Sequence, residues 1–301
     1  MSFRMLSARA EPDWDACEAV ARHHGRSFHF ASRMLPGDRR RAILAAYAYC
    51  RLADDIVDRP SVEREAIEAE LYAWEREIDR PRHPVAVAFA EARARYGIPD
   101  QPVHDLFRGL HADRTVDEYE TWEDLRGYCH YVAGTVGLIV APILGCQDDS
   151  MLPRAAELGI AMQLTNILRD VGEDAAMGRV YLPAEDMDRF GISREDVLRR
   201  RSNDRFAMLI RFEIDRAHVL YRNALTAVPA LCWSGRLTTL AAARLYAGIL
   251  DQIETNPYDV MYRRAVVPRN RKARGRAAAI GAFISCPTPR RQSRRPAEAG
   301  R

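Results

Sequence analysis

The feature that most constrains this chain is the spacing of its apolar residues, which follows a helical period along almost the whole sequence. Apolar side chains recur three and four residues apart, and no convincing set of alternating apolar and polar residues indicates β-strands. Breaks fall at Pro and Gly clusters such as Pro36-Gly37 and Gly97-Ile98-Pro99. The sequence therefore predicts an all-α fold. Helices are expected near residues 12–23, 37–58, 61–79, 84–96, 101–113, 122–144, 152–175, 203–228 and 236–256.

Length and charge predict one folded domain followed by a basic tail. With 301 residues, of which 48% are hydrophobic, the chain is long enough to bury one large core. We place the helical domain at residues 1–268 and a basic, disordered tail at residues 269–301. From Arg263 onward the chain carries twelve Lys or Arg residues and one acidic residue, Glu298. Such a segment is typical of a solvated end, although its charge also suits an anionic membrane surface or nucleic acid.

The cysteines and the N-terminus indicate an intracellular protein. None of the six cysteines forms a C-x-x-C pair, and the polar N-terminus does not resemble a signal peptide. No run of about 18 apolar residues occurs, so no membrane span is expected. We expect reduced thiols and a cytoplasmic location, with peripheral contact at the inner membrane face. No nucleic-acid partner is expected, since no recognised nucleic-acid module precedes the tail, and the oligomeric state is left open.

The helix expected at 37–58 carries acidic side chains in apolar surroundings. In steps of four, three and four residues, Tyr47, Arg51, Asp54 and Asp58 fall on one helix face. Two carboxylates four residues apart repel each other, and the cost grows in an apolar setting unless a positive charge is near. A single pair of this kind is weak evidence for a metal site, because most such pairs lie on solvated faces or at helix ends.

A second polar stripe lies on the helix expected at 152–175. Gln163, Asn166, Asp170 and Asp174 follow steps of three, four and four residues, and the other positions are mostly Leu, Ile, Met, Ala and Val. A single polar stripe on an apolar helix indicates that the stripe faces an internal polar cavity. Two stripes of this kind in one chain are much stronger evidence for a site than either stripe alone.

Two acidic stripes facing each other suit a complex of Mg²⁺ with a diphosphate. Mg²⁺ prefers oxygen ligands, usually takes one or two carboxylates, and fills its shell with water and phosphate oxygens. Such ions would take up the negative charge that builds on a diphosphate as its C–O bond breaks. Arg51 and Arg169 are expected either to pair with the acids or to reach the phosphate. A buried salt-bridge network is the alternative, whereas a di-iron bundle is set aside because no Glu-x-x-His pair occurs.

The stretch at 128–145 is unusually rich in Ala and Gly. Gly134 and Gly137 weaken a helix interior, so this helix either packs backbone against backbone or leaves room for a ligand. With two acidic stripes nearby, an apolar tunnel lined by this helix is plausible. Ionising an allylic diphosphate leaves a carbocation, which aromatic faces stabilise and which water must not reach. Candidate aromatic residues are Phe28, Tyr47, Tyr128 and Tyr246.

Five segments resemble the head-to-head prenyl synthases, the family of squalene, dehydrosqualene and phytoene synthases. The resemblance extends from about residue 20 to about residue 268 and implies an isoprenoid-synthase-type helical bundle with a central cavity. It also implies a Mg²⁺-dependent prenyltransferase acting on isoprenoid diphosphates, in which Mn²⁺ is able to substitute. For the phytoene-forming reaction no NADPH is expected. The segments are residues 23–36, 47–58, 128–137, 163–183 and 258–268.

The resemblance further implies a role for individual residues. The metal ligands that it implies are Asp54, Asp58, Asn166, Asp170 and Asp174. Residues that match diphosphate-binding or site-lining positions are Arg26, Ser27, Phe28, Arg51, Tyr246 and Arg264. Residues that match the cavity wall around the reacting carbons are Tyr47, Tyr128, Val132, Ala133, Gly137 and Gln163. Tyr181 matches a tyrosine just after the second acidic motif.

Two positions depart from the family pattern. Asp55 makes the first motif read DDIVD, which also fits chain-elongating prenyl synthases and terpene cyclases. Gly25 stands where some members have a phosphate-binding Ser.

The expected activity is the condensation of two geranylgeranyl diphosphates, via prephytoene diphosphate, to phytoene in carotenoid biosynthesis. The alternatives are a bacterial presqualene diphosphate, squalene or dehydrosqualene synthase that uses farnesyl diphosphate, and a non-catalytic helical scaffold.

Overall fold

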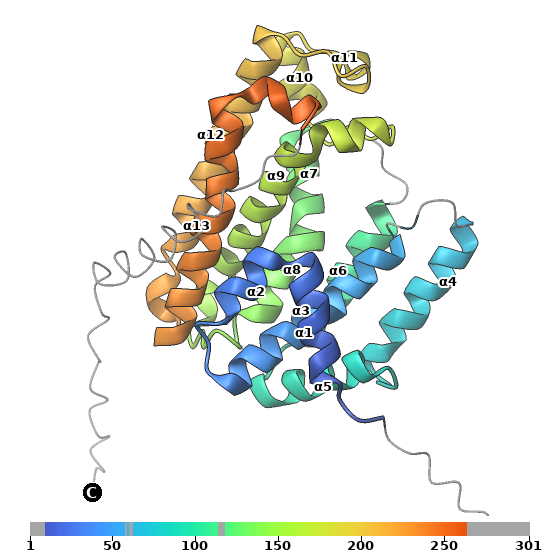
Figure 1. Cartoon of the computed structure of the whole chain (residues 1–301), viewed down its shortest axis with the longest axis vertical. Coiled ribbons are helices and arrows are strands. Elements are labelled where there is room, and N and C mark those ends of the chain that lie inside the picture. Colours follow the sequence, from blue (N-terminus) through green and yellow to red (C-terminus); the bar gives the residue numbers. More distant parts are fainter. Residues whose placement is uncertain (1–9, 58, 60–62, 114–117, 264–301) are drawn as a thin grey trace, which may run out of the picture.

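Helices and their connecting loops make up the computed structural model, which describes residues 10–57, 59, 63–113 and 118–263. The side chains of Arg26 and Asp113 are not described. Within these ranges no strand is present, so the all-α prediction is confirmed. In Figure 1, α1 to α6 gather on one side of the molecule, and α9, α12 and α13 run lengthwise along the other.

The helices have the following bounds. The α-helices are α1 (Trp14–His24), α2 (Arg26–Ser32), α3 (Gly37–Val57), α4 (Arg64–Glu75), α5 (Pro84–Tyr96), α6 (Asp100–Asp113), α7 (Trp122–Cys129), α8 (Thr135–Val140), α9 (Leu152–Ala176), α10 (Ala184–Phe190), α11 (Arg194–Leu198), α12 (Asp204–Leu225) and α13 (Trp233–Thr255). The shorter turns are η1 (Arg76–Ile78), the π turn η2 (His130–Gly134), η3 (Asp149–Met151), η4 (Val228–Ala230) and η5 (Pro257–Met261).

The π turn η2 divides the helix that was expected to be continuous over 122–144. The Thr135 amide donates to the His130 carbonyl, five residues back, and the Thr135 hydroxyl donates to the Tyr131 carbonyl at 2.6 Å. One additional residue is thereby fitted into the turn, which local helical spacing does not reveal. Such turns often occur at functional sites, and here Val132 and Ala133 in this turn line the cavity described below.

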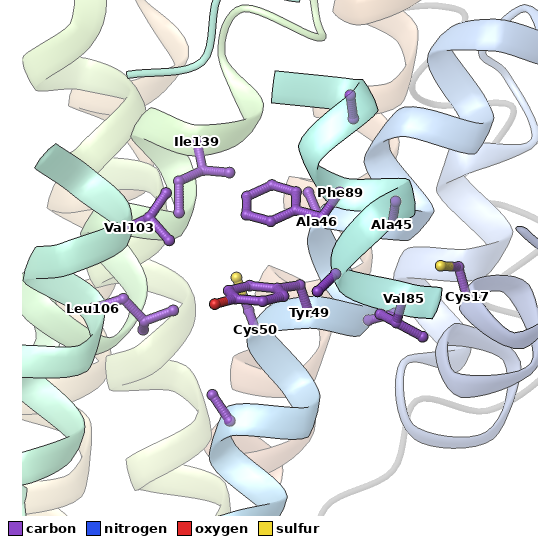
Figure 2. Close-up of a cluster of buried hydrophobic side chains, with 14 of the residues drawn as sticks. Cys17, Ala45, Ala46, Tyr49, Cys50, Val85, Phe89, Val103, Leu106 and Ile139 are labelled. Carbon is purple, nitrogen blue, oxygen red and sulfur yellow. The ribbon is translucent and has the colours of Figure 1, made fainter. Parts of the chain in front are cut away.

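The first hydrophobic core packs around Tyr49 of α3, which is fully buried (Figure 2). The Tyr49 ring stacks on Phe89 of α5, with centroids 4.7 Å apart, and on Trp74 of α4, at 5.0 Å. The Tyr49 hydroxyl donates to the Trp74 carbonyl at 3.0 Å, and the Trp74 indole donates to the Tyr49 carbonyl at 3.1 Å. One face of α3 is thus held in the core, which leaves the face with Tyr47 and Arg51 directed elsewhere.

The second core surrounds α9, which packs against α12 and α13. Leu164 and Leu168 of α9 are fully buried in it, together with Phe206 and Ile210 of α12. These apolar positions occupy the side of α9 opposite its polar stripe. The two cores therefore fix the orientation of α3 and α9, the two helices that carry the acidic motifs.

The backbone of α9 lies unusually close to the backbones of η2 and α8. A Cβ atom on Gly137 would collide with the Ala155 carbonyl, and one on Gly159 would collide with the Ala133 carbonyl. Gly137 also lines the cavity. The close packing and the ligand space, which were alternative explanations of the Gly-rich stretch, therefore occur in the same helix.

Candidate active site

A largely apolar cavity of about 250 Å³ lies between the two halves of the bundle. Its lining on α9 extends from Arg154 to Asn166, and twelve residues of α-helix rise about 18 Å. The cavity is therefore elongated, with Cys146, Met151 and Arg154 toward one end of α9. Predicted site residues that line it are Phe28, Tyr47, Val132, Ala133, Gly137, Gln163, Asn166 and Tyr246.

Small and apolar residues from the C-terminal helices complete the cavity wall. Ala224 from α12, Val228 from η4, and Thr238 and Ala242 from α13 take part in the lining. None of these residues is identifiable as a site residue from the sequence, because Ala, Val and Thr on an amphipathic helix carry no signal that separates cavity lining from core. Only the way α12 and α13 pack against α9 brings them to the cavity.

Tyr47 stacks on Phe28 at the cavity wall. Their ring centroids are 4.7 Å apart and the ring planes differ by 22°. Burial raises the pKa of Tyr47, and the neighbouring Tyr246 raises it further, so its phenol is neutral. Gly25, at the junction of α1 and α2, allows the Tyr47 hydroxyl to come close, because a Cβ there would lie 2.5 Å from that oxygen. A Ser at position 25 would therefore not fit this arrangement.

Tyr246 of α13 lies between the two helices that carry the acidic stripes. Burial raises the pKa of Tyr246, while Arg169 acts to lower it and Asp170 acts to raise it. Tyr246 also interacts electrostatically with Tyr47 of α3. The polar end of the cavity is therefore formed by side chains of α3, α9 and α13 together.

The first acidic stripe is only partly described. Arg51 pairs with Asp55, four residues later on α3, and the His24 ring nitrogen Nε2 lies 3.8 Å from Asp55. Asp54 is half-buried on the same helix and interacts electrostatically with Tyr47. Asp58 lies outside the described residues. Arg51 is therefore paired with an acid in this structure, one of the two roles expected for it.

The second acidic stripe holds Asp170 in a two-pronged pair with Arg169. The Arg169 Nε donates to one carboxylate oxygen at 2.8 Å, and its Nη2 donates to the other at 2.5 Å. Asn166 Nδ2 contacts Gln163 Oε1 at 3.4 Å. The Asn166 Oδ1 atom is buried and accepts no hydrogen bond among the residues that the structure describes. An amide oxygen in this state suits a ligand that brings positive charge.

The donors at this end of the cavity fit a hard divalent cation. In the described part of the chain, which excludes Asp58, no three His, Cys, Asp or Glu side chains are grouped closely enough to hold a metal ion. Mg²⁺ does not need a cage made of protein alone, since water and phosphate oxygens complete its shell. Carboxylates of Asp54 and Asp170, together with the unpartnered Asn166 Oδ1, are oxygen donors of the type that Mg²⁺ prefers.

Three tyrosines form a separate aromatic cluster beside the second core. The ring centroids of Tyr119, Tyr128 and Tyr181 lie 5.4 to 6.0 Å apart. The Arg179 Nη1 atom contacts the Tyr181 hydroxyl at 3.5 Å. Tyr128 was expected in the wall around the reacting carbons, but it belongs to this cluster and is not among the residues that line the cavity. Tyr119 was not selected from the sequence, because nothing in its local spacing distinguishes it.

The remaining predicted residues are placed only in part. Ser27 lies in the first turn of α2 and is half-buried, and Asp174 lies one turn after Asp170 on α9, where it lines a small pocket with Tyr181. Arg26 begins α2, but its side chain is not described, and Arg264 lies outside the described residues. Among the helices that the structure describes, each is too short or too polar to span a bilayer.

An all-α bundle whose apolar cavity ends beside two acidic helix faces is the arrangement of a helical isoprenoid synthase. Residues 21–271 match the family model described as squalene/phytoene synthase. The chain belongs to this family, so the resemblance stated from the five segments is confirmed.

Curated relatives and solved structures agree with this assignment. The chain is 38% identical over 282 residues to a 15-cis-phytoene synthase of Synechocystis sp., covering 88% of this chain and 83% of the relative. It is 37% identical to the chloroplastic phytoene synthase 2 of Solanum lycopersicum, covering 86% of this chain and 87% of the relative. The fold is similar to that of a dehydrosqualene synthase solved in complex with a ligand, with a TM-score of 0.83 and 31% identity over 91% of this chain and 97% of that chain. It is also similar to a squalene synthase from Alicyclobacillus acidocaldarius, with a TM-score of 0.74 and 28% identity over 81% of this chain and 94% of that chain.

Proposed function

We propose that the chain condenses two molecules of geranylgeranyl diphosphate head to head to form phytoene. The observation that carries this proposal is the elongated apolar cavity, whose polar end lies between α3 and α9 and which suits a prenyl tail with a diphosphate at one end. The choice of phytoene is supported by the relatives named phytoene synthase, which are 37–38% identical to this chain over most of its length.

The proposed metal ligands are Asp54, Asp58, Asn166, Asp170 and Asp174. Bound Mg²⁺ would supply positive charge that stabilises the leaving diphosphate. Arg169 and Arg51 pair with acids in this structure, and with substrate bound their guanidinium groups would donate hydrogen bonds to the diphosphate. Removal of divalent ions with EDTA is expected to abolish turnover, and addition of Mg²⁺ or Mn²⁺ is expected to restore it.

The protein side chains of the cavity protect and orient the reacting carbons. In the first step the C–O bond of the donor breaks, the diphosphate leaves with the electron pair, and the allylic cation reacts with the double bond of the second molecule. Loss of a proton closes the cyclopropane of prephytoene diphosphate. The faces of Tyr47, Phe28 and Tyr246 stabilise the cation, and the apolar wall excludes water that would quench it to an alcohol.

The second ionisation follows the same chemistry at the same end of the cavity. Prephytoene diphosphate loses its diphosphate, the carbon skeleton rearranges, and a second proton is lost to give phytoene. No hydride is added in this sequence, so no nicotinamide is required. Over the whole reaction two diphosphates and two protons leave, which balances the conversion of two substrate molecules to one hydrocarbon.

The decisive experiment is a product analysis with two substrates. The purified protein is incubated with geranylgeranyl diphosphate or farnesyl diphosphate and Mg²⁺, with and without NADPH, and the extracted hydrocarbons are identified by mass spectrometry. Phytoene from the twenty-carbon substrate without NADPH is expected. Exclusive use of the fifteen-carbon substrate would instead show a squalene or dehydrosqualene synthase.

We also propose that the helical domain ends near residue 268 and that the basic tail at residues 269–301, which lies outside the described residues, contacts anionic membranes. Deletion of residues 275–301 is expected to leave phytoene formation unchanged and to reduce sedimentation with anionic vesicles. Equal sedimentation of both proteins would show that the tail is not the contact.

A further inference from the structure

Arg200 has a backbone conformation that costs free energy for any residue other than glycine. Among the described residues, Arg200 is the only non-glycine residue with a positive φ, which is 53°. It follows α11, whose C-terminal turn is closed by two hydrogen bonds of 2.8 Å, from the Arg200 amide to the Val197 carbonyl and from the Arg201 amide to the Asp196 carbonyl. This pattern normally places glycine at the position of Arg200.

The same chain uses glycine in the equivalent turn nine residues earlier. At the end of α10, Gly191 has a φ of 65°, its amide donates to the Asp188 carbonyl, and the Ile192 amide donates to the Met187 carbonyl. The turn therefore does not require an arginine. A strained residue that persists where a relaxed one would serve indicates a function for its side chain.

The Arg200 side chain reaches the back of α9 behind the second acidic stripe. Its Nη2 donates to the Gly172 carbonyl at 2.7 Å. Gly172 lies two residues from both Asp170 and Asp174, so it is on the opposite face of the helix from these carboxylates. The contact therefore holds the metal-binding turn of α9 from behind without touching the cavity.

The same point of α9 is held by η5 from a second direction. A Cβ on Gly172 would collide with the Met261 carbonyl, so the two backbones pack directly against each other. The next residue, Tyr262, donates its hydroxyl to the Arg200 carbonyl at 2.9 Å. We call Arg200, Gly172, Met261 and Tyr262 the α9 clamp, because they join α11, η5 and the acidic turn of α9.

We propose that Arg200 is a positioning residue that, through the α9 clamp, orients Asp170 and Asp174 for divalent metal and diphosphate. The proposal rests on the proposed function, in which these carboxylates are metal ligands. Groups that orient metal ligands from behind typically change metal affinity by about 10- to 100-fold when they are removed.

The test compares three variants in a Mn²⁺ titration with inorganic diphosphate present. Electron paramagnetic resonance monitors the titration. Arg200→Gly removes the side chain and relaxes the backbone, so the melting temperature is expected to stay equal or to rise. Its apparent Mn²⁺ affinity is nevertheless expected to fall by about 10-fold. Tyr262→Phe removes only the exposed hydroxyl and is expected to show a smaller loss in the same direction.

Arg201→Ala is the matched control. Arg201 is the next residue, also an arginine, and its guanidinium pairs at 3.2 Å with Asp196 of α11. The Arg201→Ala variant is expected to bind Mn²⁺ with the same affinity as the unaltered protein. Equal Mn²⁺ affinity in Arg200→Gly and the unaltered protein would overturn the proposal, as would a loss that merely follows a lower melting temperature.

The outcomes also separate this proposal from the proposed function. If the unaltered protein takes up no Mn²⁺ with diphosphate and forms no hydrocarbon, the metal assignment fails and the clamp proposal fails with it. If the unaltered protein binds Mn²⁺ and forms phytoene while Arg200→Gly and Tyr262→Phe bind it equally well, only the clamp proposal is overturned.

Discussion

The buried carboxyl group of Glu213 is expected to make the stability of this protein fall as pH rises. Glu213 of α12 is fully buried, and its Oε1 accepts from Arg216 Nη1 at 2.5 Å. The same Arg216 atom donates to Asp186 of α10 at 2.7 Å, and Asp186 is 5% exposed. Two buried carboxyl groups thus share one guanidinium, so retaining one proton avoids an uncompensated buried charge.

Burial raises the pKa of Glu213 from its usual 4.5 to about 8, although Arg216 opposes the shift. The folded protein therefore keeps a proton between pH 4.5 and pH 8 that the unfolded chain releases. The contribution of Glu213 to the free energy of unfolding is fully present below pH 4.5 and is lost as pH rises toward 8. Taken alone, this pKa difference between the folded and unfolded chain corresponds to at most about 5 kcal/mol of unfolding free energy.

Glu213→Gln is the variant that tests this reasoning. Gln has nearly the same shape and keeps an oxygen that accepts from Arg216, but it does not titrate. We expect the unfolding free energy of the variant, measured by urea titration, to lose this decline between pH 5 and pH 8. The variant should therefore gain stability relative to the unaltered protein as pH rises. Parallel pH profiles for the two proteins would refute the shared-guanidinium argument.

Three further predictions concern the cavity. Asp54→Asn and Asp170→Asn are each expected to lower the rate of phytoene formation by about 100-fold or more. Both variants are expected to keep a helical circular dichroism spectrum. Unchanged turnover would instead favour a non-catalytic scaffold. Tyr47→Phe is expected to keep most activity, because the raised pKa of Tyr47 leaves its phenol neutral and the ring still stacks on Phe28; loss of activity would assign a role to the hydroxyl. Gly137→Ala is expected to destabilise the fold by about 1–3 kcal/mol in urea titrations, since the new Cβ would collide with the Ala155 carbonyl; unchanged stability would contradict the close packing.

The amino-acid sequence by itself determined the helical class and the identity of the acidic stripes. Helical spacing is local, because residues three and four apart share a face whatever the rest of the chain does. Asp170 and Asn166 were therefore placed on one stripe of α9 without any knowledge of the fold. The family resemblance, which depends on motif order along the chain, is confirmed, while the individual metal-ligand roles stay predictions.

Only the tertiary structure decided which faces meet. The aromatic side chain of Tyr128 and its match to the family's cavity wall gave no means of distinguishing the cavity from the aromatic cluster with Tyr119 and Tyr181, because that choice depends on how α7 packs against more distant segments. The small residues of α12 and α13 in the wall, and the contact of Arg200 with Gly172, likewise join segments that are far apart in the chain. Periodicity assigns a residue to a face, but burial against a particular partner follows from the packing of the whole bundle.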